Sequence, residues 1–523
     1  MLIALCGCGR GDTAAESQAP SPDVRLSTGV VHTEAGPVRG QVASDHVLFQ
    51  AIPYAAPPVG ELRWQPPAPS AAWEGMRDAT KSGPRCIQDT AGNPGSGRGT
   101  SEDCLTLNVW APTAAAGLPV MVWIHGGAFL TGSAELYNAQ WLATQGRMIV
   151  VTVNYRLGSL GFLAHPSFGP PDRLGNYGLA DQQAALRWVR DNIEGFGGDP
   201  AKVTVAGESA GAMSVCDHLV APESAGLFRA AIVMSGPCQA QLEVGAARKP
   251  SLDYAASLGC PDPATAVRCL RDLPAAALTK PLFYYQIGAD GLSGPLTRTA
   301  TLPVDPVQAI HSGLESPVPV LMGTNRDEFT LFVALQHFTY GRESTVDEYP
   351  ELLADTFGAD ADAVAQRYPV DNYGGSVSLA YAAAVTDGAF ACVADRMGRD
   401  LVAAGAPVYA YEFTDRTAPA PEPFRQLPFP VGASHSLELQ YLFDVGGRPP
   451  LDGPQRRLGD QMIAYFSQFV STGVPVAPDA PDWPRFDADG SPRMSFDADG
   501  SRVRTDFDRE HQCAFWAALP PPR

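Results

Sequence analysis

The chain has 523 residues, 45% of them hydrophobic and 18% charged, and its formal net charge at pH 7 is −19. This acidic balance argues against nucleic acid and anionic membrane surfaces as partners. The length allows a large core, and no internal repeat divides it. No uninterrupted apolar run of about 18 residues occurs, so no transmembrane span is expected.

The first 25 residues differ in character from the rest. MLIALCGCGRGD runs from apolar to small to polar residues, and its LCGC resembles the end of a bacterial lipoprotein signal in which Cys8 would carry the lipid. The segment is short for a signal peptide and lacks a basic start, so a wrongly assigned start is the alternative. We expect residues 1–25 to be a leader and flexible tether, residues 26–518 a single domain, and residues 519–523 a tail.

Strand-like and helical segments alternate along most of the chain. Residues 26–110 contain short apolar runs broken by proline and glycine, which predicts a small β-meander. Continuous apolar strands are expected within 119–129, 148–156, 202–208, 229–236, 317–329 and 407–413, with helices at 178–193, 210–220 and 510–519. This alternation predicts an α/β fold, with a large and mostly parallel central sheet and helices on both faces.

The stretch KVTVAGESAGAMSV, residues 202–215, contains a candidate nucleophile. A strand turns into a helix there, with Ser209 at the apex between small residues, as in a nucleophile elbow. The five-residue pattern GxSxG alone would arise about 0.3 times by chance in a chain of this composition. The serine therefore needs support from a base, an acid and oxyanion donors elsewhere in the chain.

The order of catalytic residues in hydrolases of this architecture is serine, acid, histidine. The segment GTNRDEF follows a later strand and offers Asp327 or Glu328 as the acid. Among the histidines after it, His435 in a Gly/Ser loop suits a base better than His337 or His511.

Oxyanion donors are expected where HGGAF follows the strand at 119–124. Glycine allows the backbone to approach a ligand, so Gly127 and Ala128 could donate their N–H groups together with that of Ala210. An ordinary glycine turn is the alternative.

Cysteine spacing leaves several pairings open. Without Cys6 and Cys8, eight cysteines remain, and eight allow 105 full pairings. The chain after residue 25 contains no CxxC or HExxH pattern, so no zinc site is expected. Its two FDADGS repeats lack the Gly and Glu that a calcium loop needs at fixed positions, so no calcium site is expected either. Disulfides would indicate an oxidising compartment.

Five motifs together resemble the type-B carboxylesterase and cholinesterase family of α/β-hydrolases. They are EDCLTLNVW from residue 102, HGGAF, the long segment NYGLADQQAALRWVRDNIEGFGGDPAKVTVAGESAG, GTNRDEF and HSLELQYLF. The resemblance extends over residues 26–518 and implies an α/β-hydrolase fold.

The resemblance implies a role for each matching residue. Ser209 would be the nucleophile, Glu328 rather than Asp327 the acid, and His435 the base. Glu208 would be a carboxylate close to the histidine. Further implied features are oxyanion donors at Gly127, Ala128 and Ala210, disulfides Cys86–Cys104, Cys260–Cys269 and Cys392–Cys513, and structural ion pairs Arg63–Glu102 and Arg156–Asp181. Cys216 and Cys238 are left over, and we interpret both as free thiols.

Three departures from the family pattern bear on specificity. Ala128 replaces a glycine but keeps its N–H, and Phe329 replaces the glycine after the acid, which would narrow that side of the pocket. The loop between Cys86 and Cys104 is short and polar and lacks the tryptophan with which cholinesterases bind choline, which argues against quaternary ammonium ligands and lipid droplets.

The sequence therefore predicts a serine carboxylesterase that needs no cofactor and acts on small-molecule short- to medium-chain or aryl esters. A lipase, polyester hydrolase or carbamate hydrolase of the same family is the alternative, and a neuroligin-like binding protein is a more distant one. We expect a bacterial, secreted or cell-envelope location, and the oligomeric state is unknown.

Overall fold

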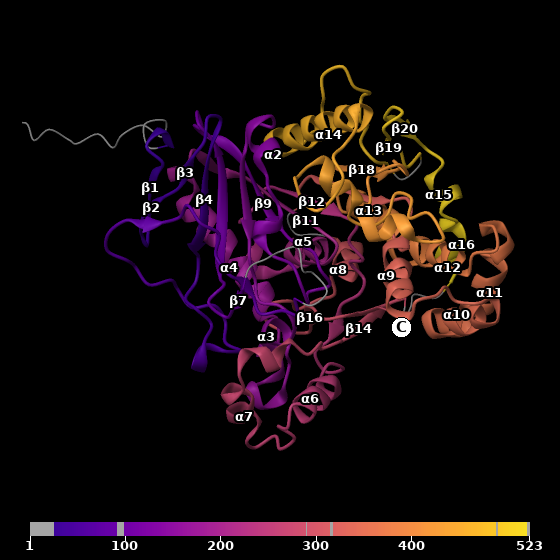
Figure 1. Ribbon diagram of the computed structural model, residues 1–523, viewed down its shortest axis with the longest axis horizontal. Helices are drawn as coiled ribbons and strands as arrows, with labels where there is room; N and C mark the ends of the chain where they lie inside the picture. The colour runs from indigo at the N-terminus through magenta and orange to yellow at the C-terminus, as the bar shows by residue number, and fades with distance from the viewer. Residues whose placement is uncertain (1–25, 91–98, 289, 314–316, 488–489, 520–523) are drawn as a thin grey trace, which may run out of the picture.

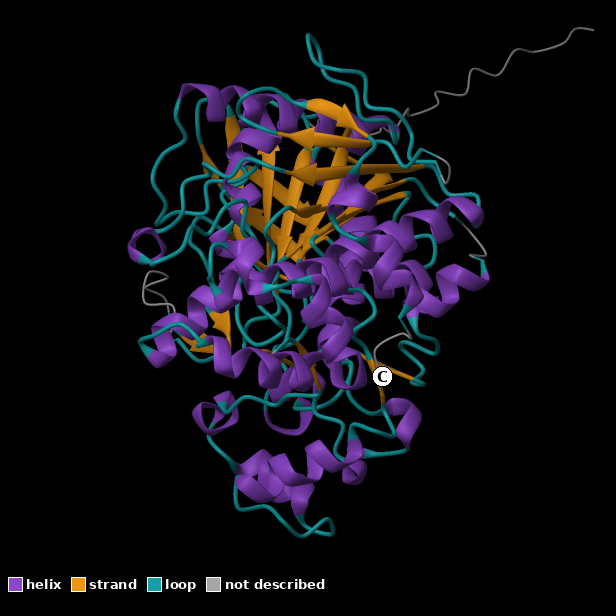
Figure 2. Ribbon diagram, turned by 90° about the vertical axis from the view of Figure 1, so that its right-hand side faces the viewer, coloured by secondary structure: helices purple, strands orange, loops and turns teal. Residues whose placement is uncertain are grey.

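The computed structural model describes residues 26–90, 99–288, 290–313, 317–487 and 490–519. Its centre is an 11-stranded sheet surrounded by helices (Figures 1 and 2). In spatial order the strands are β20 (Arg502–Arg504), β19 (Arg493–Phe496), β18 (Val408–Phe413), β17 (Val320–Asn325), β12 (Ala230–Met234), β11 (Gly198–Glu208), β9 (Leu118–Ile124), β10 (Ile149–Val153), β8 (Thr106–Pro112), β4 (His46–Pro53) and β3 (Gln41–Val42).

The strands from β19 to β10 are all parallel to their neighbours, whereas both edges of the sheet are antiparallel. The mostly parallel sheet predicted from the sequence is thereby confirmed. The expected N-terminal meander is only partly present. β1 (Val30–Thr33), β2 (Gly36–Arg39) and β5 (Arg77–Asp78) form a separate small sheet, while β3, β4 and β8 extend the central one.

Each face of the sheet has its own core, because side chains of a strand alternate between the two faces. In β9, Val120, Val122 and Ile124 belong to one core, and Met121 and Trp123 belong to the other. The first core is covered by α4 (Tyr177–Asn192), α5 (Ala210–Val220) and α13 (Cys392–Ala403), and the second by α14 (Gly453–Thr472) and α2 (Gln140–Thr144).

Further helices lie beyond the carboxyl ends of the strands. α6 (Arg248–Ser257) and α7 (Ala266–Asp272) group at one end of the molecule (Figure 1). At another end lie α9 (Thr330–Tyr340), α10 (Tyr349–Phe357), α11 (Ala361–Arg367), α12 (Val377–Val385) and the C-terminal α15 (Phe507–Glu510) and α16 (Cys513–Ala518) (Figure 1).

One described helical run, Val377–Ala403, is long and apolar enough by composition to cross a membrane, but 72% of its most apolar window is buried inside the protein. It comprises α12, a π-helical segment η12 (Thr386–Ala391) and α13. Burial of this kind is typical of a core helix.

Four disulfides join the described cysteines. Cys86–Cys104, Cys260–Cys269 and Cys392–Cys513 are the three pairs that the resemblance implied. The interpretation of Cys216 and Cys238 as free thiols is wrong, because they form the fourth bond. Cys216 lies on α5, and Cys238 follows the neighbouring strand β12, so the packing of α5 beside that strand's end brings their α-carbons to 6.1 Å. The leader with Cys8 lies outside the described residues.

Candidate active site

Ser209 occupies a sharp turn between β11 and α5. Its backbone has φ 57° and ψ −125°, a conformation that a residue with a side chain rarely adopts and that is held here by a hydrogen bond from its N–H to the Met234 carbonyl (2.9 Å). Both flanking glycines are needed. A Cβ on Gly207 would lie 2.5 Å from the Gly211 carbonyl carbon, and a Cβ on Gly211 would lie 2.0 Å from the Ile124 oxygen. The half-buried serine is thus presented at the carboxyl edge of the sheet.

Glu328 and His435 are joined directly. Glu328 follows β17, and its Oε2 lies 2.6 Å from His435 Nδ1, while its Oε1 accepts the Asn325 N–H at 2.7 Å. Backbone bonds hold the two loops together, because the His435 N–H donates to the Glu328 carbonyl and the Asp327 N–H donates to the Ala433 carbonyl. Glu328 is fully buried, which suits an orienting carboxylate.

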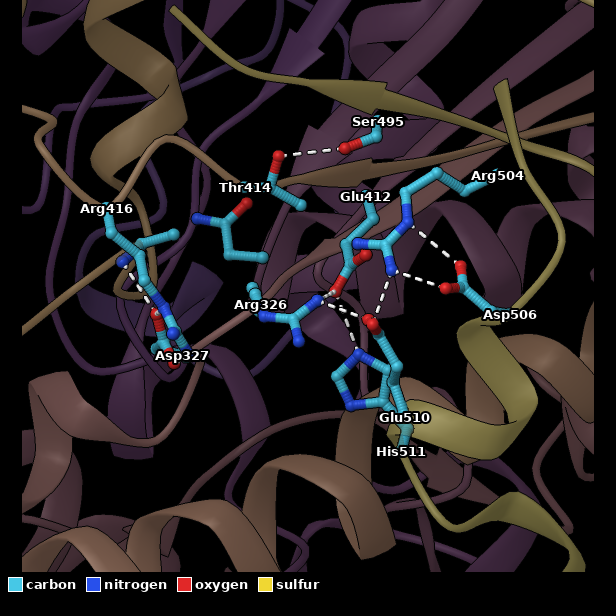
Figure 3. A network of polar contacts seen from close by, with 12 residues as sticks. Arg326, Asp327, Glu412, Thr414, Arg416, Ser495, Arg504, Asp506, Glu510 and His511 are labelled. Atoms are coloured by element: carbon cyan, nitrogen blue, oxygen red, sulfur yellow. Dashed lines mark hydrogen bonds and ion pairs between the residues drawn. The ribbon is translucent and has the colours of Figure 1, made fainter. Parts of the chain in front are cut away.

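The neighbouring Asp327 points elsewhere. Its carboxylate forms a bidentate ion pair with Arg416 at 2.6 and 2.8 Å and accepts the Ala433 N–H (Figure 3). The geometry therefore separates the two candidate acids, since only Glu328 contacts the histidine.

The second ring nitrogen of His435 faces the serine side of the site. Nε2 makes no hydrogen bond within the described residues and lies 3.2 Å from Oε1 of Glu208, the residue before Ser209. No hydrogen bond joins His435 to Ser209 in the described part of the chain, and contacts between a catalytic base and its nucleophile often tighten when substrate binds. Ser436 donates to the same Glu208 oxygen, which fixes this carboxylate.

Buried carboxylates dominate the electrostatics of His435. Burial lowers its pKa, but the nearby Glu208 and Glu328, the hydrogen bond to Glu328, and Glu438 outweigh burial and raise the pKa to about 9. Burial also raises the pKa of Glu208, and it raises that of Glu438 to about 8 with help from the other two carboxylates. The cluster thus stabilises a protonated imidazole and favours at least one protonated carboxyl.

The HGGAF loop lies against the nucleophile. A Cβ on Gly126 would come within 3.0 Å of the Ser209 Cβ. Gly127, Ala128 and Phe129 all have positive φ, and the Gly127 carbonyl accepts the N–H groups of residues 130 and 131. None of the hydrogen bonds among the described residues uses the N–H of Gly127, Ala128 or Ala210. Three donors are therefore available for an oxyanion.

Three further histidines, two of which the sequence offered as alternative bases, lie in different surroundings. His125 stacks on Tyr155, and burial lowers its pKa to about 4, so it is neutral. His337 is on α9. His511 contacts Asp387 and Glu412 at the C-terminal end of the fold.

The sequence reasoning missed four residues of this site. Glu438 adds a fully buried carboxyl group, and the half-buried Arg448 adds a cation that donates to the Ser436 carbonyl at 2.8 Å. The rings of Phe332 and Phe390 lie 5.4 and 5.6 Å from the His435 ring. Glu438 was detectable as an acidic residue three positions after the histidine, whereas nothing near Phe390 in the sequence signals the site.

Phe329, which we expected to narrow one side of the pocket, is fully buried and stacks on Phe332 with 4.7 Å between the ring centroids. Any narrowing of the pocket by Phe329 therefore acts through the ring of Phe332.

Both expected ion pairs are present and structural. Arg63 contacts Glu102 at 2.5 and 2.6 Å and also donates to the carbonyls of residues 271 and 273. Arg156 contacts the fully buried Asp181 at 2.7 and 2.8 Å. The first pair joins the segments around Arg63 and Glu102 to the end of α7, and the second joins the segment after β10 to α4.

Comparison with known proteins agrees with this geometry. The sequence profile of the carboxylesterase family matches residues 27–516, so the chain belongs to the carboxylesterase family. A fumonisin B1 esterase from Sphingopyxis macrogoltabida is 36% identical over 505 residues, covering 92% of this chain and 88% of that protein. A solved thermophilic PNB esterase superposes with a TM-score of 0.81 at 32% identity, covering 94% of this chain and all of that one.

These findings make the protein a carboxylic ester hydrolase with the α/β-hydrolase fold, acting on small-molecule esters. Its four disulfides are typical of an extracellular or periplasmic protein.

Proposed function

We propose that this protein is a serine carboxylesterase that works through an acyl-enzyme. The observation that supports the proposal most strongly is the contact between Glu328 and His435 Nδ1. The other ring nitrogen of His435, Nε2, lies beside Glu208, the residue before Ser209 in the elbow. His435 takes the Ser209 proton as Oγ attacks the ester carbonyl carbon, and the oxyanion accepts the N–H groups of Gly127, Ala128 and Ala210.

Collapse of this intermediate breaks the bond to the alkoxy oxygen, which receives the proton from His435. Water then enters, gives a proton to His435, and attacks the acyl carbon, and release of the acid returns that proton to Ser209. Glu328 orients the ring and, with Glu208, stabilises the imidazolium in both steps.

We further propose short- to medium-chain or aryl esters as substrates, because the segment between Cys86 and Cys104 is short and polar rather than an apolar lid. Lipase, polyester or carbamate hydrolysis is the alternative that a substrate panel tests. A lipid anchor at Cys8 and export from the cytoplasm belong to the same proposal.

The test measures initial rates on p-nitrophenyl esters from acetate to palmitate with the wild-type protein and Ser209→Ala. Ser235→Ala is a matched control, since Ser235 is buried, has φ 53°, and follows the adjacent strand β12. We expect activity highest on short chains, lost in Ser209→Ala and kept in Ser235→Ala. Retained activity in Ser209→Ala would exclude the mechanism, and a maximum at long chains would indicate a lipase.

Fumonisin B1, the substrate in the name of the relative, belongs in the same panel. Its hydrolysis at a rate above that of the p-nitrophenyl esters would replace our substrate proposal with a larger, more specialised ester.

A further inference from the structure

A second histidine lies between two buried carboxylates at the C-terminal end of the fold. His511 follows α15, and its ring is almost fully buried. Its Nδ1 lies 2.5 Å from Asp387 Oδ1. Its Nε2 lies 2.8 Å from Glu412 Oε1, and Figure 3 shows this second contact. With both carboxylates ionised, each ring nitrogen must donate to a carboxylate oxygen, so both carry protons. The ring is therefore an imidazolium bridging two elements, β18 and η12.

One of these carboxylates leads to the residue that begins the acid turn. Glu412 Oε1 also lies 3.5 Å from Nη1 of Arg326, and that same nitrogen donates to Glu510 Oε2 at 2.6 Å (Figure 3). The Arg326 N–H donates to the Phe413 carbonyl at 3.0 Å. Arg326 is two residues before Glu328, so its side chain and backbone both fix the start of the turn.

The other carboxylate leads to the residue that follows the acid. Asp387 is on the π-helix η12, whose first residue, Thr386, accepts the N–H of Phe329 at 2.9 Å through its hydroxyl oxygen. Later in the same segment, Phe390 packs its ring edge-on against the His435 ring. Short π-helical segments are often found at functional sites. Here η12 contacts His435 directly and also contacts Phe329, the residue after Glu328.

We propose that His511 is a positioning residue for ester hydrolysis, which holds the acid turn from both sides through Glu412–Arg326 and Asp387–Thr386 and so keeps Glu328 in hydrogen-bond contact with His435. This inference rests on the proposed triad. The disulfide Cys392–Cys513 fastens the same segment to α13, so the C-terminal helices become part of the active-site support.

The network around His511 includes further polar and charged side chains. Besides its two partners, the network holds Tyr368, which donates to Asp387 at 2.8 Å, and Arg504, which contacts Glu510 and Asp506. What the network supplies is a defined geometry.

The test compares His511→Gln with His218→Gln. His218 is equally buried and bonded through both nitrogens, to Ser224 and Gln182, but no contact among the described residues joins it to the acid turn. We expect His511→Gln to lower kcat by about 10- to 100-fold with KM little changed, as misplacement of a catalytic group does. Because Glu328 raises the pKa of His435, the acid limb of the kcat/KM profile should also move to lower pH.

Two variants of Asp387 provide the conservative rescue. Asp387→Asn retains an acceptor oxygen for the His511 N–H and should keep most of kcat, whereas Asp387→Ala should match His511→Gln. If His511→Gln does not fold, these two variants still test whether the network positions the acid turn. All rates are measured well below the unfolding midpoint of each variant.

Unchanged kcat and an unchanged acid limb in His511→Gln or Asp387→Ala, with only a lower unfolding midpoint, would overturn the inference and leave His511 a stabilising residue. Labelling by a fluorophosphonate probe separates this from failure of the triad. A wild-type protein that is labelled while Ser209→Ala is not retains the proposed function whatever His511 does.

Discussion

At the residue scale, the contact that matters most for rate is the 2.6 Å bond between Glu328 and His435. Glu328→Gln presents an amide that can donate to Nδ1 and thereby favours the wrong tautomer, so we expect kcat to fall on the order of 10⁴-fold. Asp327→Asn should lose far less, because Asp327 pairs with Arg416. Steady-state kinetics on p-nitrophenyl acetate measures both, and equal losses would contradict the assignment of the acid.

Glu208 should control the pH dependence. Its carboxylate raises the pKa of His435, so Glu208→Gln should lower that pKa and keep the imidazole unprotonated at more acidic pH. The acid limb of kcat/KM should therefore move to lower pH, while kcat at the plateau falls because the imidazolium formed during reaction is less stabilised. A limb that stays in place would mean that Glu208 does not act on the histidine.

The triad residues could be predicted because each stands in a short, ordered motif next to a strand end. The charged and aromatic groups around His435 could not be predicted from the sequence. Glu438 comes close to His435 because the chain after the histidine returns to the end of β17, where the Asn325 amide donates to Glu438, and Arg448 contacts the Ser436 carbonyl beside it. Phe390 arrives from η12. Such contacts depend on tertiary packing and have no spacing signal.

At the scale of elements, the bond between Cys216 and Cys238 fastens the nucleophile helix α5 to the end of β12. The double variant Cys216→Ser/Cys238→Ser should lower the free energy of unfolding by about 3 kcal/mol, as expected for a loop of this size. Denaturant unfolding measures the change. A matched control is Cys260→Ser/Cys269→Ser, whose closed loop is shorter and which lies away from α5.

Thiol titration of the unfolded protein checks the pairing directly. The eight described cysteines should give no free thiol before reduction. Two reactive thiols that map to Cys216 and Cys238 would restore the original interpretation.

The predicted strands and helices mostly exist within a few residues of the expected positions, because buried parallel strands such as β9 and β10 are continuous apolar runs. Strand order and the break between α12 and α13 were not predictable. The π-helical turn η12 lies in an alanine-rich run that reads as one helix, and its widening reflects the contacts of Thr386 and Asp387 with the acid turn and the tail. The pairing of Cys216 with Cys238 depended on the same kind of packing information.

At the scale of the whole molecule, His511 ties the last helices to the sheet and should make stability depend on pH. Burial lowers the pKa of His511, but Asp387 and Glu412 outweigh it and raise the pKa from 6.5 to about 10. The folded state therefore binds this proton more tightly than the unfolded state does. The contribution of the imidazolium is fully present below pH 6.5, decreases as the pH rises above that value, and is lost as the pH passes through about 10.

The unfolding midpoint of the wild-type protein should accordingly fall as the pH is raised from 6.5 to 10. His511→Gln should have a lower midpoint at pH 6.5 and a shallower fall, so that the two curves converge near pH 10. His435, whose pKa is about 9 in the wild-type protein, adds to the fall, and because its pKa is expected to be lower in His511→Gln, its contribution there is smaller and acts in the same direction. In His218→Gln the fall should be as steep as in the wild type, because burial lowers the pKa of His218 to about 3 and the ring is neutral throughout this range. Parallel curves for wild type and His511→Gln would show that His511 is not held as an imidazolium, and the charged link between the C-terminal helices and the acid turn would then have to be abandoned.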